Sequence, residues 1–89
     1  MVLRILLLSG LIACGAFGQN TKENAEFKLA INLYNDHLYD LAQEQLKQFV
    51  AAYPATSQGV EARFYLGLTQ LQLKQYEDAR ISFQTFALT

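Results

Sequence analysis

The chain has few of the residues on which metal and catalytic sites are most often built. One of its 89 residues is a cysteine, Cys14, and one is a histidine, His37. With His37 as the only histidine, we expect neither a histidine-based metal cluster nor a Cys–His dyad. The five glycines form no phosphate-binding loop, and the carboxylates are scattered. The sequence therefore predicts a protein that is not an enzyme and needs no cofactor, with His37 as a solvated turn residue.

Charge is also scarce. Charged residues make up 17% of the chain against 52% hydrophobic residues, and the formal net charge is −1. This balance is typical of a globular protein rather than a disordered one. No basic excess is available for phosphates, so neither nucleic acid nor an anionic membrane surface is expected as the main partner.

Residues 1–18 have the features of a secretory signal peptide. Arg4 supplies the positive charge, and the apolar run from Ile5 to Ala13 is too short to span a bilayer comfortably. Ala16 and Gly18 place small residues before a cut at Gln19. The alternative is a short buried helix at the N-terminus, but the polar segment 19–24 that follows favours export. The expected location is the periplasm, or the periplasmic face of the outer membrane, of a bacterium.

A second cut is consistent with the same leader. The stretch Leu11-Ile12-Ala13-Cys14 resembles the lipobox of bacterial lipoproteins, in which the cysteine becomes the lipidated first residue. A cut before Gln19 instead removes the only cysteine and leaves no disulfide. Cys14 is thus either a lipidation site, which would be the only membrane attachment, or part of the discarded leader.

Beyond the leader, apolar residues recur at helical spacing and no strand pattern is present. Asn20 and Glu23 form a capping-box pattern before the first helix. Pro54 ends the second helix, and Thr56 or Ser57 can cap the third. The sequence predicts one small all-α domain with helices at about 21–35, 38–53, 58–73 and 75–88.

The four helices form a repeat with a step of 37 residues. The stretch HLYDLAQEQL from His37 matches KQYEDARISF from Lys74, and six of the 28 positions from Ala25 to Ala52 are identical in the second copy. A fixed period between about 20 and 50 residues indicates a solenoid of helix hairpins.

The repeated residues have a packing explanation. Two antiparallel helices about 8–10 Å apart need a small residue where they cross. We expect the tyrosine that opens each second helix to pack its ring across the turn, and the large residue four positions after the alanine to fill the space beyond it. The repeat-defining residues, first copy before second, are Ala30 and Gly67, Tyr39 and Tyr76, Ala42 and Ala79, and Leu46 and Phe83.

At these residues the chain resembles the tetratricopeptide repeat family. The stretch YLGLTQLQLKQYEDARISF matches best, with Leu66-Gly67, Tyr76, Ala79 and Phe83 at the family's spacing. The family's usual repeat has about 34 residues. The longer step here, with the link AAYPATSQGVEA, is similar to bacterial envelope proteins of the BamD and Tol-Pal coordinator type. The resemblance implies two stacked helix hairpins, 25–54 and 58–89, as a short α-solenoid.

The resemblance also implies a surface for a protein or peptide partner on the first helix of each hairpin. For the apolar members, burial between neighbouring helices is the alternative to partner contact; for the polar members, plain solvation is. Basic residues that would grip a peptide carboxylate are absent from these positions. The candidate partner-binding residues are Asn24, Phe27, Ile31, Tyr34, Asn35, Glu61, Phe64, Leu68, Leu71 and Gln72.

Two hairpins are few for such an array, because about three are needed to bury a continuous core. The last helix reaches Thr89 without a cap and leaves Ile81, Phe83, Phe86 and Leu88 uncovered in the sequence pattern. We expect the chain either to be the first part of a longer repeat protein, with the second hairpin truncated, or to associate with itself. The leading function is a non-catalytic interaction scaffold. The alternatives are a lipid-anchored part of an outer-membrane assembly machine and the docking module of an enzyme whose catalytic domain follows.

Overall fold

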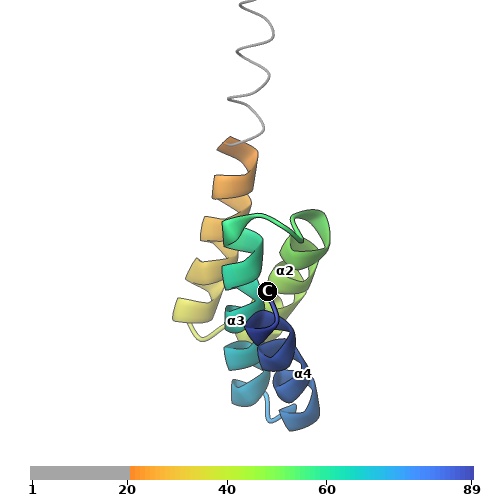
Figure 1. Cartoon of the computed structure of the whole chain (residues 1–89). Coiled ribbons are helices and arrows are strands. Elements are labelled where there is room, and N and C mark those ends of the chain that lie inside the picture. Colours follow the sequence, from red (N-terminus) through yellow and green to blue (C-terminus); the bar gives the residue numbers. More distant parts are fainter. Residues whose placement is uncertain (1–20) are drawn as a thin grey trace, which may run out of the picture.

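A computed structural model of the chain describes residues 21–89, and these residues form an all-α structure. Residues 21–35 are helical, and three helices follow: α2 (Tyr39–Ala52), α3 (Ser57–Gln72) and α4 (Tyr76–Ala87). Successive helices run in opposite directions, so the chain forms two helix hairpins side by side (Figure 1). The predicted helices are confirmed, with ends that differ from the expected ones by about one residue. The expected cap at Asn20 and the leader with Cys14 lie outside the described residues.

The two hairpin turns have the same geometry. His37 (φ 63°) and Lys74 (φ 61°) both adopt the left-handed conformation, 37 residues apart. In each turn this residue donates its backbone N–H to the carbonyl three residues before it, at 3.0 Å from His37 to Tyr34 and at 3.0 Å from Lys74 to Leu71. The next residue donates as well, from Leu38 to the carbonyl of Leu33 at 3.0 Å and from Gln75 to that of Gln70 at 2.8 Å. Paired hydrogen bonds of this type satisfy the last carbonyls of a helix. The sequence repeat is therefore a repeat of backbone structure.

The second helices begin without a side-chain cap. The residues before them, Leu38 (φ −89°, ψ 67°) and Gln75 (φ −91°, ψ 70°), again have matching conformations, and neither makes a capping side-chain hydrogen bond. Their carbonyls accept from the backbone N–H groups of Ala42 at 2.8 Å and Ala79 at 2.9 Å. Leu38 and Gln75 thus precede helices that had been expected to include them.

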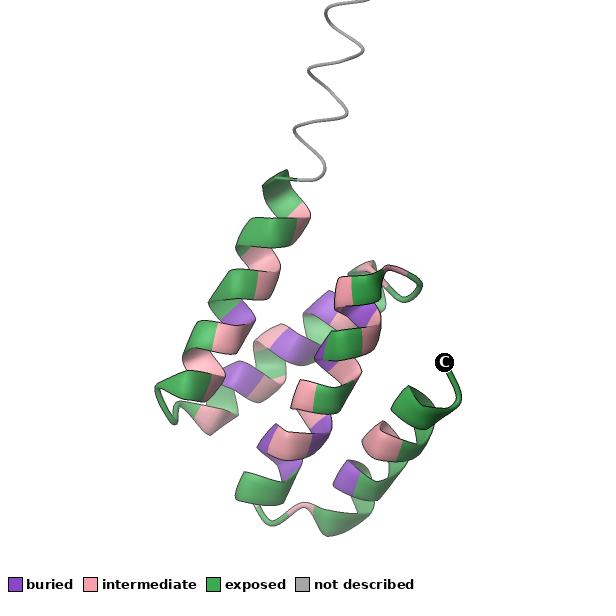
Figure 2. Ribbon diagram, turned by 60° about the vertical axis from the view of Figure 1, so that its left-hand side comes forward, coloured by how far each residue is buried: buried purple, intermediate pink, exposed green. Residues whose placement is uncertain are grey.

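The core lies where the hairpins cross and is made largely of small residues. Ala30, Ala42 and Ala62 are fully buried, and they form one cluster with Leu46 and Phe49. Figure 2 shows the buried positions on the inner sides of the helices. The alanines keep the helix axes close, which is the role predicted for Ala30 and Ala42. Ala79, their counterpart in the second hairpin, is 1% exposed.

At the helix crossing of the second hairpin, Gly67 and Phe83 pack differently from their counterparts in the first hairpin. An added Cβ at Gly67 would lie 2.6 Å from a ring carbon of Phe83, well inside ordinary contact distance. The first hairpin has Ala30 and the smaller Leu46 at the two equivalent positions. The missing methyl group of Gly67 therefore makes room for the larger ring of Phe83.

Two expectations about the second hairpin were wrong. Phe83 is half-buried rather than uncovered, because its ring packs against Gly67 and against Phe64, with the two ring centroids 5.7 Å apart. Tyr76 opens α4 as predicted, but its ring does not pack across the turn and the residue is 64% exposed. Its counterpart Tyr39 is half-buried because it lies against Tyr34, at a centroid distance of 5.8 Å.

The elbow between α2 and α3 holds the two hairpins together. Thr56 caps α3 by accepting a hydrogen bond from the backbone N–H of Gly59 at 3.0 Å. A Cβ at Gly59 would overlap the carbonyl oxygen of Tyr53, so only glycine fits there. Arg63 donates from its guanidinium to the carbonyl of Pro54 at 2.8 Å. Of the two caps left open by the sequence, Thr56 is the one used.

Candidate functional site

The candidate partner surface lies on the first helices of the two hairpins, the segment 21–35 and α3. These helices run in the same direction (Figure 1), and the rings of Tyr34 and Tyr65 join them at a centroid distance of 5.5 Å. The fold therefore brings the two predicted sets, which are far apart in the sequence, to neighbouring helices.

The four polar candidates are all exposed. They are Asn24 and Asn35 in the segment 21–35 and Glu61 and Gln72 in α3. Amide and carboxylate groups at such positions can donate to or accept from the backbone of a bound peptide. Both partner contact and simple solvation require exposed side chains. These four residues therefore remain candidates for partner contact.

Two of the apolar candidates are directed into their own hairpins. Phe27 packs against Phe49 with ring centroids 5.4 Å apart, and Phe64 packs against Phe86 at 5.3 Å. These pairs are 37 residues apart and have nearly the same interplanar angle, 53° and 49°. Aromatic pairs in this tilted arrangement stabilise a fold beyond their buried area. Phe27 and Phe64 therefore act first as packing residues of the hairpins, although Phe64 is still 37% exposed.

The other apolar candidates are partly open to solvent. Ile31 and Leu68 are half-buried, and Leu71 is 41% exposed. Ile31 and Leu68 occupy equivalent positions in the two repeats. Each of these three residues therefore leaves apolar surface open on the first helices.

Tyr34 is the candidate most tightly held by its surroundings. Its ring lies between Tyr39 and Tyr65, at centroid distances of 5.8 Å and 5.5 Å. Burial raises the pKa of the Tyr34 hydroxyl above its ordinary value of 10.0, and the neighbouring Tyr39 and Tyr65 raise that pKa further. The neutral phenol is therefore maintained, and it can donate or accept a hydrogen bond where the two hairpins meet.

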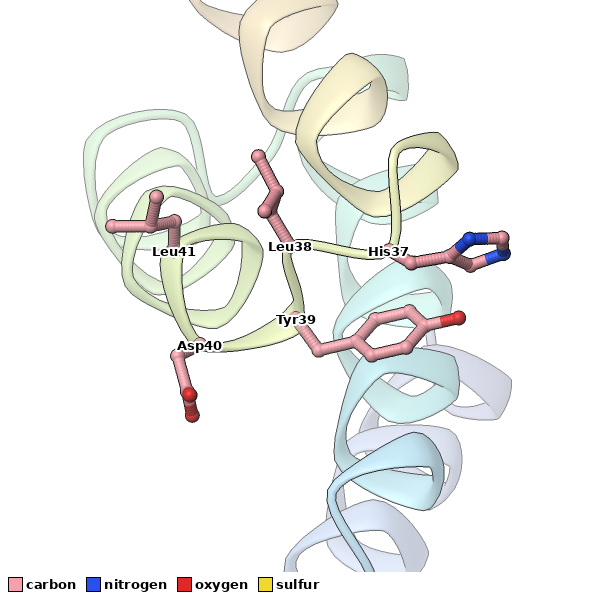
Figure 3. A pocket seen from close by; sticks show the side chains of 5 residues that line it. All are labelled: His37, Leu38, Tyr39, Asp40 and Leu41. Atoms are coloured by element: carbon pink, nitrogen blue, oxygen red, sulfur yellow. The ribbon is translucent and has the colours of Figure 1, made fainter.

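A hollow of about 310 Å³ lies at the first hairpin turn (Figure 3). His37 and Tyr39 point to one side of the chain, with ring centroids 5.6 Å apart, while Leu38, Asp40 and Leu41 point away from them. Its lining comes from five consecutive residues, His37, Leu38, Tyr39, Asp40 and Leu41. Such a local, open depression lacks the convergent groups from separate elements that are typical of a ligand site.

Two polar contacts between elements had not been predicted. The side-chain amide of Gln43 donates to that of Gln75 at 2.6 Å across the two hairpins, and the Ser82 hydroxyl donates to Gln70 at 2.6 Å. Gln70 is only 4% exposed, so the Ser82 hydroxyl provides a needed partner for a buried amide. The repeat contained a signal for this pair, because Leu33 and Gln45 of the first copy change together to Gln70 and Ser82.

Within residues 21–89, no three His, Cys, Asp or Glu side chains are grouped so that they could hold a metal ion. In the same part of the chain, no helix combines the length and apolarity that a bilayer span requires. Comparisons with protein-family models, with curated proteins and with solved structures found no match to the chain.

Proposed function

We propose that the chain is a non-catalytic protein–protein interaction scaffold built as a short α-solenoid similar to tetratricopeptide repeats of the longer type. The observation that carries this proposal is the repetition of the hairpin at atomic detail. The left-handed turn residues, the capping conformations and the Phe–Phe pairs all recur after 37 residues. Repetition of this kind is characteristic of solenoids, which bind partners along extended surfaces.

The binding surface of this proposal is the side formed by the first helices. Ile31, Leu68 and Leu71 provide an apolar floor, and Asn35 and Gln72 provide exposed amides beside it. An extended peptide segment suits this arrangement, because alternate side chains can pack on the floor while its backbone bonds to the amides. The partner's terminal carboxylate is not the anchor, since the candidate set contains no lysine or arginine.

Export to the bacterial envelope is part of the same proposal and rests on the sequence of residues 1–18. The mass of the mature N-terminus tests it. A chain that starts at Gln19 supports simple secretion, and a lipid-modified chain that starts at Cys14 supports the membrane-anchored form. An intact Met1 in the mature protein would contradict export.

Site-specific cross-linking tests the binding surface. A photoreactive amino acid is placed at Asn35 or Gln72, and a matched control is placed at Gln48, which is exposed on the second helix of the first hairpin. We expect the same partner to be captured from Asn35 and Gln72 and not from Gln48. Equal capture from all three positions would contradict a defined surface on the first helices.

A substitution then relates binding to stability. Leu68→Ala, at a half-buried floor position, is compared with Phe64→Ala, which removes the ring packed against Phe86. We expect Leu68→Ala to weaken capture with a small loss of thermal stability. Phe64→Ala is expected to lower the melting temperature clearly, since large-to-small changes in packed positions cost about 3–5 kcal/mol when fully buried and less when partly exposed. Capture unchanged by Leu68→Ala would remove this residue from the surface.

A further inference from the structure

Three tyrosines from three helices meet where the two hairpins join. Tyr34 lies in the segment 21–35, Tyr39 begins α2 and Tyr65 lies in α3. The ring of Tyr34 is in the middle, with its centroid 5.8 Å from that of Tyr39 and 5.5 Å from that of Tyr65, in edge-to-face contacts at 62° and 77°. We call these three residues the tyrosine triad. All three are half-buried, so each ring packs on a neighbour and still leaves part of its surface open.

The fold of a single hairpin does not require two of these tyrosines. At the positions 37 residues away, Tyr34 corresponds to Leu71 and Tyr65 corresponds to Lys28. The hairpins that contain Leu71 and Lys28 nevertheless have the same turn conformations and the same Phe–Phe pairs. The triad is therefore specific to the junction between the hairpins and is not part of the repeated packing.

The triad lies on the side of the molecule that carries the proposed binding surface. Tyr34 follows Ile31 by three positions, and Tyr65 precedes Leu68 by three positions. Residues three apart on a helix share a face, so the two rings lie beside the apolar residues of that surface. Tyrosine rings at such a position supply a large, rigid contact area at little cost in side-chain entropy.

Hydrogen-bond donors accompany the rings. Burial, and after it the neighbouring Tyr39 and Tyr65, raise the pKa of the Tyr34 hydroxyl above 10.0, so this hydroxyl keeps its proton at neutral pH and can donate. Asn35, the next residue in the chain, has an exposed side-chain amide. Neither the triad nor Asn35 carries a charge with which an acidic or basic partner could form an ion pair.

The described part of the chain offers a partner no strand edge. Residues 21–89 contain helices and turns but no strand, and the backbone groups of a helix are bonded within it. A partner in β conformation would leave its own N–H and C=O groups to be satisfied by side chains alone. A proline-rich segment has fewer N–H groups to satisfy, and its polyproline II conformation is extended before binding. The entropy lost on binding is then small, which favours such a partner on a surface of only two hairpins.

The size of the triad fits one turn of a polyproline II helix. Because the centroids of Tyr39 and Tyr65 lie 5.8 Å and 5.5 Å from that of Tyr34, they are no more than about 11 Å apart. A polyproline II helix has three residues per turn, so residues three apart are separated by about 9 Å. Two prolines at this spacing can pack on either side of Tyr34, while carbonyls between them accept from the Tyr34 hydroxyl and the Asn35 amide.

We infer that the tyrosine triad binds a proline-rich partner segment in the polyproline II conformation, with prolines three residues apart. Aromatic rings combined with donors are a recurrent way of recognising such segments. The inference rests on the proposed scaffold function and specifies the chemistry of its partner.

Binding of synthetic peptides to the full chain tests the inference. A fluorescently labelled peptide of Pro-Pro-Ala repeats is compared, by anisotropy, with Gly-Ser-Ala and Gly-Arg-Ala peptides of equal length. We expect the Pro-Pro-Ala peptide to bind about tenfold more tightly than either of the others. Tyr34→Leu introduces the residue that the other hairpin has and is expected to weaken binding about tenfold. Tyr76→Leu, at a tyrosine that is 64% exposed outside the triad, is the matched control and should leave binding unchanged.

A second measurement does not depend on the folding of a variant. Amide chemical shifts of the unmodified chain are recorded as the Pro-Pro-Ala peptide is added, and the changes are expected around Asn35, Tyr39 and Tyr65. Changes confined to α4 would contradict the inference. It also fails if the Gly-Ser-Ala or Gly-Arg-Ala peptide binds as tightly, or if Tyr76→Leu weakens binding as much as Tyr34→Leu.

Cross-linking separates failure of the inference from failure of the scaffold function. A partner that is captured from Asn35 through a segment without proline contradicts the inference and leaves the scaffold function in place. If neither Asn35 nor Gln72 captures any partner, the scaffold function fails, and the inference fails with it. Capture through a segment with prolines three residues apart supports both.

Discussion

The two hairpins have the same internal geometry but differ in what covers them. Their turns, their capping conformations and their Phe–Phe pairs agree closely. Burial does not repeat, because Leu46 is fully buried while Phe83 is half-buried and Phe86 is 37% exposed. The repeated residues thus specify the shape of one hairpin, and the neighbouring hairpin decides which of its faces are core.

The largest effect is expected where the hairpins join. Gly59→Ala places a methyl group on the carbonyl oxygen of Tyr53, and backbone atoms cannot move aside as a flexible side chain can. We expect a loss of about 3 kcal/mol in the free energy of unfolding, at the upper end of overpacking effects. Urea denaturation followed by circular dichroism measures this loss.

The first hairpin provides the control for Gly59. Lys22 occupies the position 37 residues before Gly59. Within residues 21–89, no earlier helix packs against it. Lys22→Ala is expected to change stability by less than about 0.5 kcal/mol, as is usual for exposed positions. If Gly59→Ala lowers the free energy of unfolding no more than Lys22→Ala does, then Gly59 does not lie close to the carbonyl of Tyr53 in solution.

The next effect concerns the helix crossing of the second hairpin. Gly67→Ala alone drives a methyl group against the Phe83 ring and is expected to cost about 1–3 kcal/mol. Phe83→Leu alone leaves space and is expected to cost about 1 kcal/mol. The double variant reproduces the Ala30 and Leu46 pair of the first hairpin. It should be more stable than the sum of the two losses predicts, with a coupling of about 1 kcal/mol or more.

Thermal unfolding of the four members of this cycle measures the coupling. Additive losses would show that Gly67 and Phe83 are not in contact. Additive losses would also remove the explanation of why the repeat has Ala with Leu in one copy and Gly with Phe in the other.

The turns should respond equally in both hairpins. His37 and Lys74 hold left-handed conformations that cost a non-glycine residue about 1–2 kcal/mol. His37→Gly and Lys74→Gly relieve this cost but add freedom to the unfolded chain, so each should raise stability by about 0.5–1 kcal/mol. Gln48→Gly, in the interior of α2, is the control and should lower stability by about 1 kcal/mol. Melting temperatures that rise at only one of the two turns would show that the turns differ in solution.

The sequence predicted the hairpins well because their determinants are local. The spacing of Ala42, Ala79 and the flanking large residues states where two helices cross, and Pro54 with Thr56 marks the break between hairpins. The left-handed turns were not predicted, because neither His37 nor Lys74 is a glycine or asparagine. Their conformation follows from the paired hydrogen bonds that end each helix, which become visible only once the helices are placed.

The site was harder to predict because exposure depends on which neighbouring helix covers each face. Phe27 and Phe64 had the spacing of groove residues, yet each ring packs on the second helix of its own hairpin. Tyr76 matches Tyr39 in the sequence, but Tyr39 has Tyr34 beside it whereas Tyr76 has Leu71 at the corresponding position. A one-dimensional pattern shows which residues share a helix face and does not show which of these faces a neighbour will cover.

The smallest predicted effect is a difference between the hairpins in how stability depends on pH. Burial raises the pKa of Tyr34 and Tyr53 above 10.0, and Glu26 and Glu23 raise the pKa of Tyr53 further. The folded chain keeps these phenol protons to higher pH than the unfolded chain, so the resulting stability is present below pH 10 and is lost as pH rises through the folded pKa values. The variant with Tyr34→Phe and Tyr53→Phe should lose less stability between pH 9 and pH 11 than the unmodified chain, by urea midpoints. Tyr76→Phe, in the exposed position of the second hairpin, serves as the control and should retain the alkaline loss. Tyr65 of the neighbouring hairpin helps to cover Tyr34. If the double variant loses as much stability at alkaline pH as the unmodified chain, the tyrosines of the first hairpin are no better shielded from water than Tyr76.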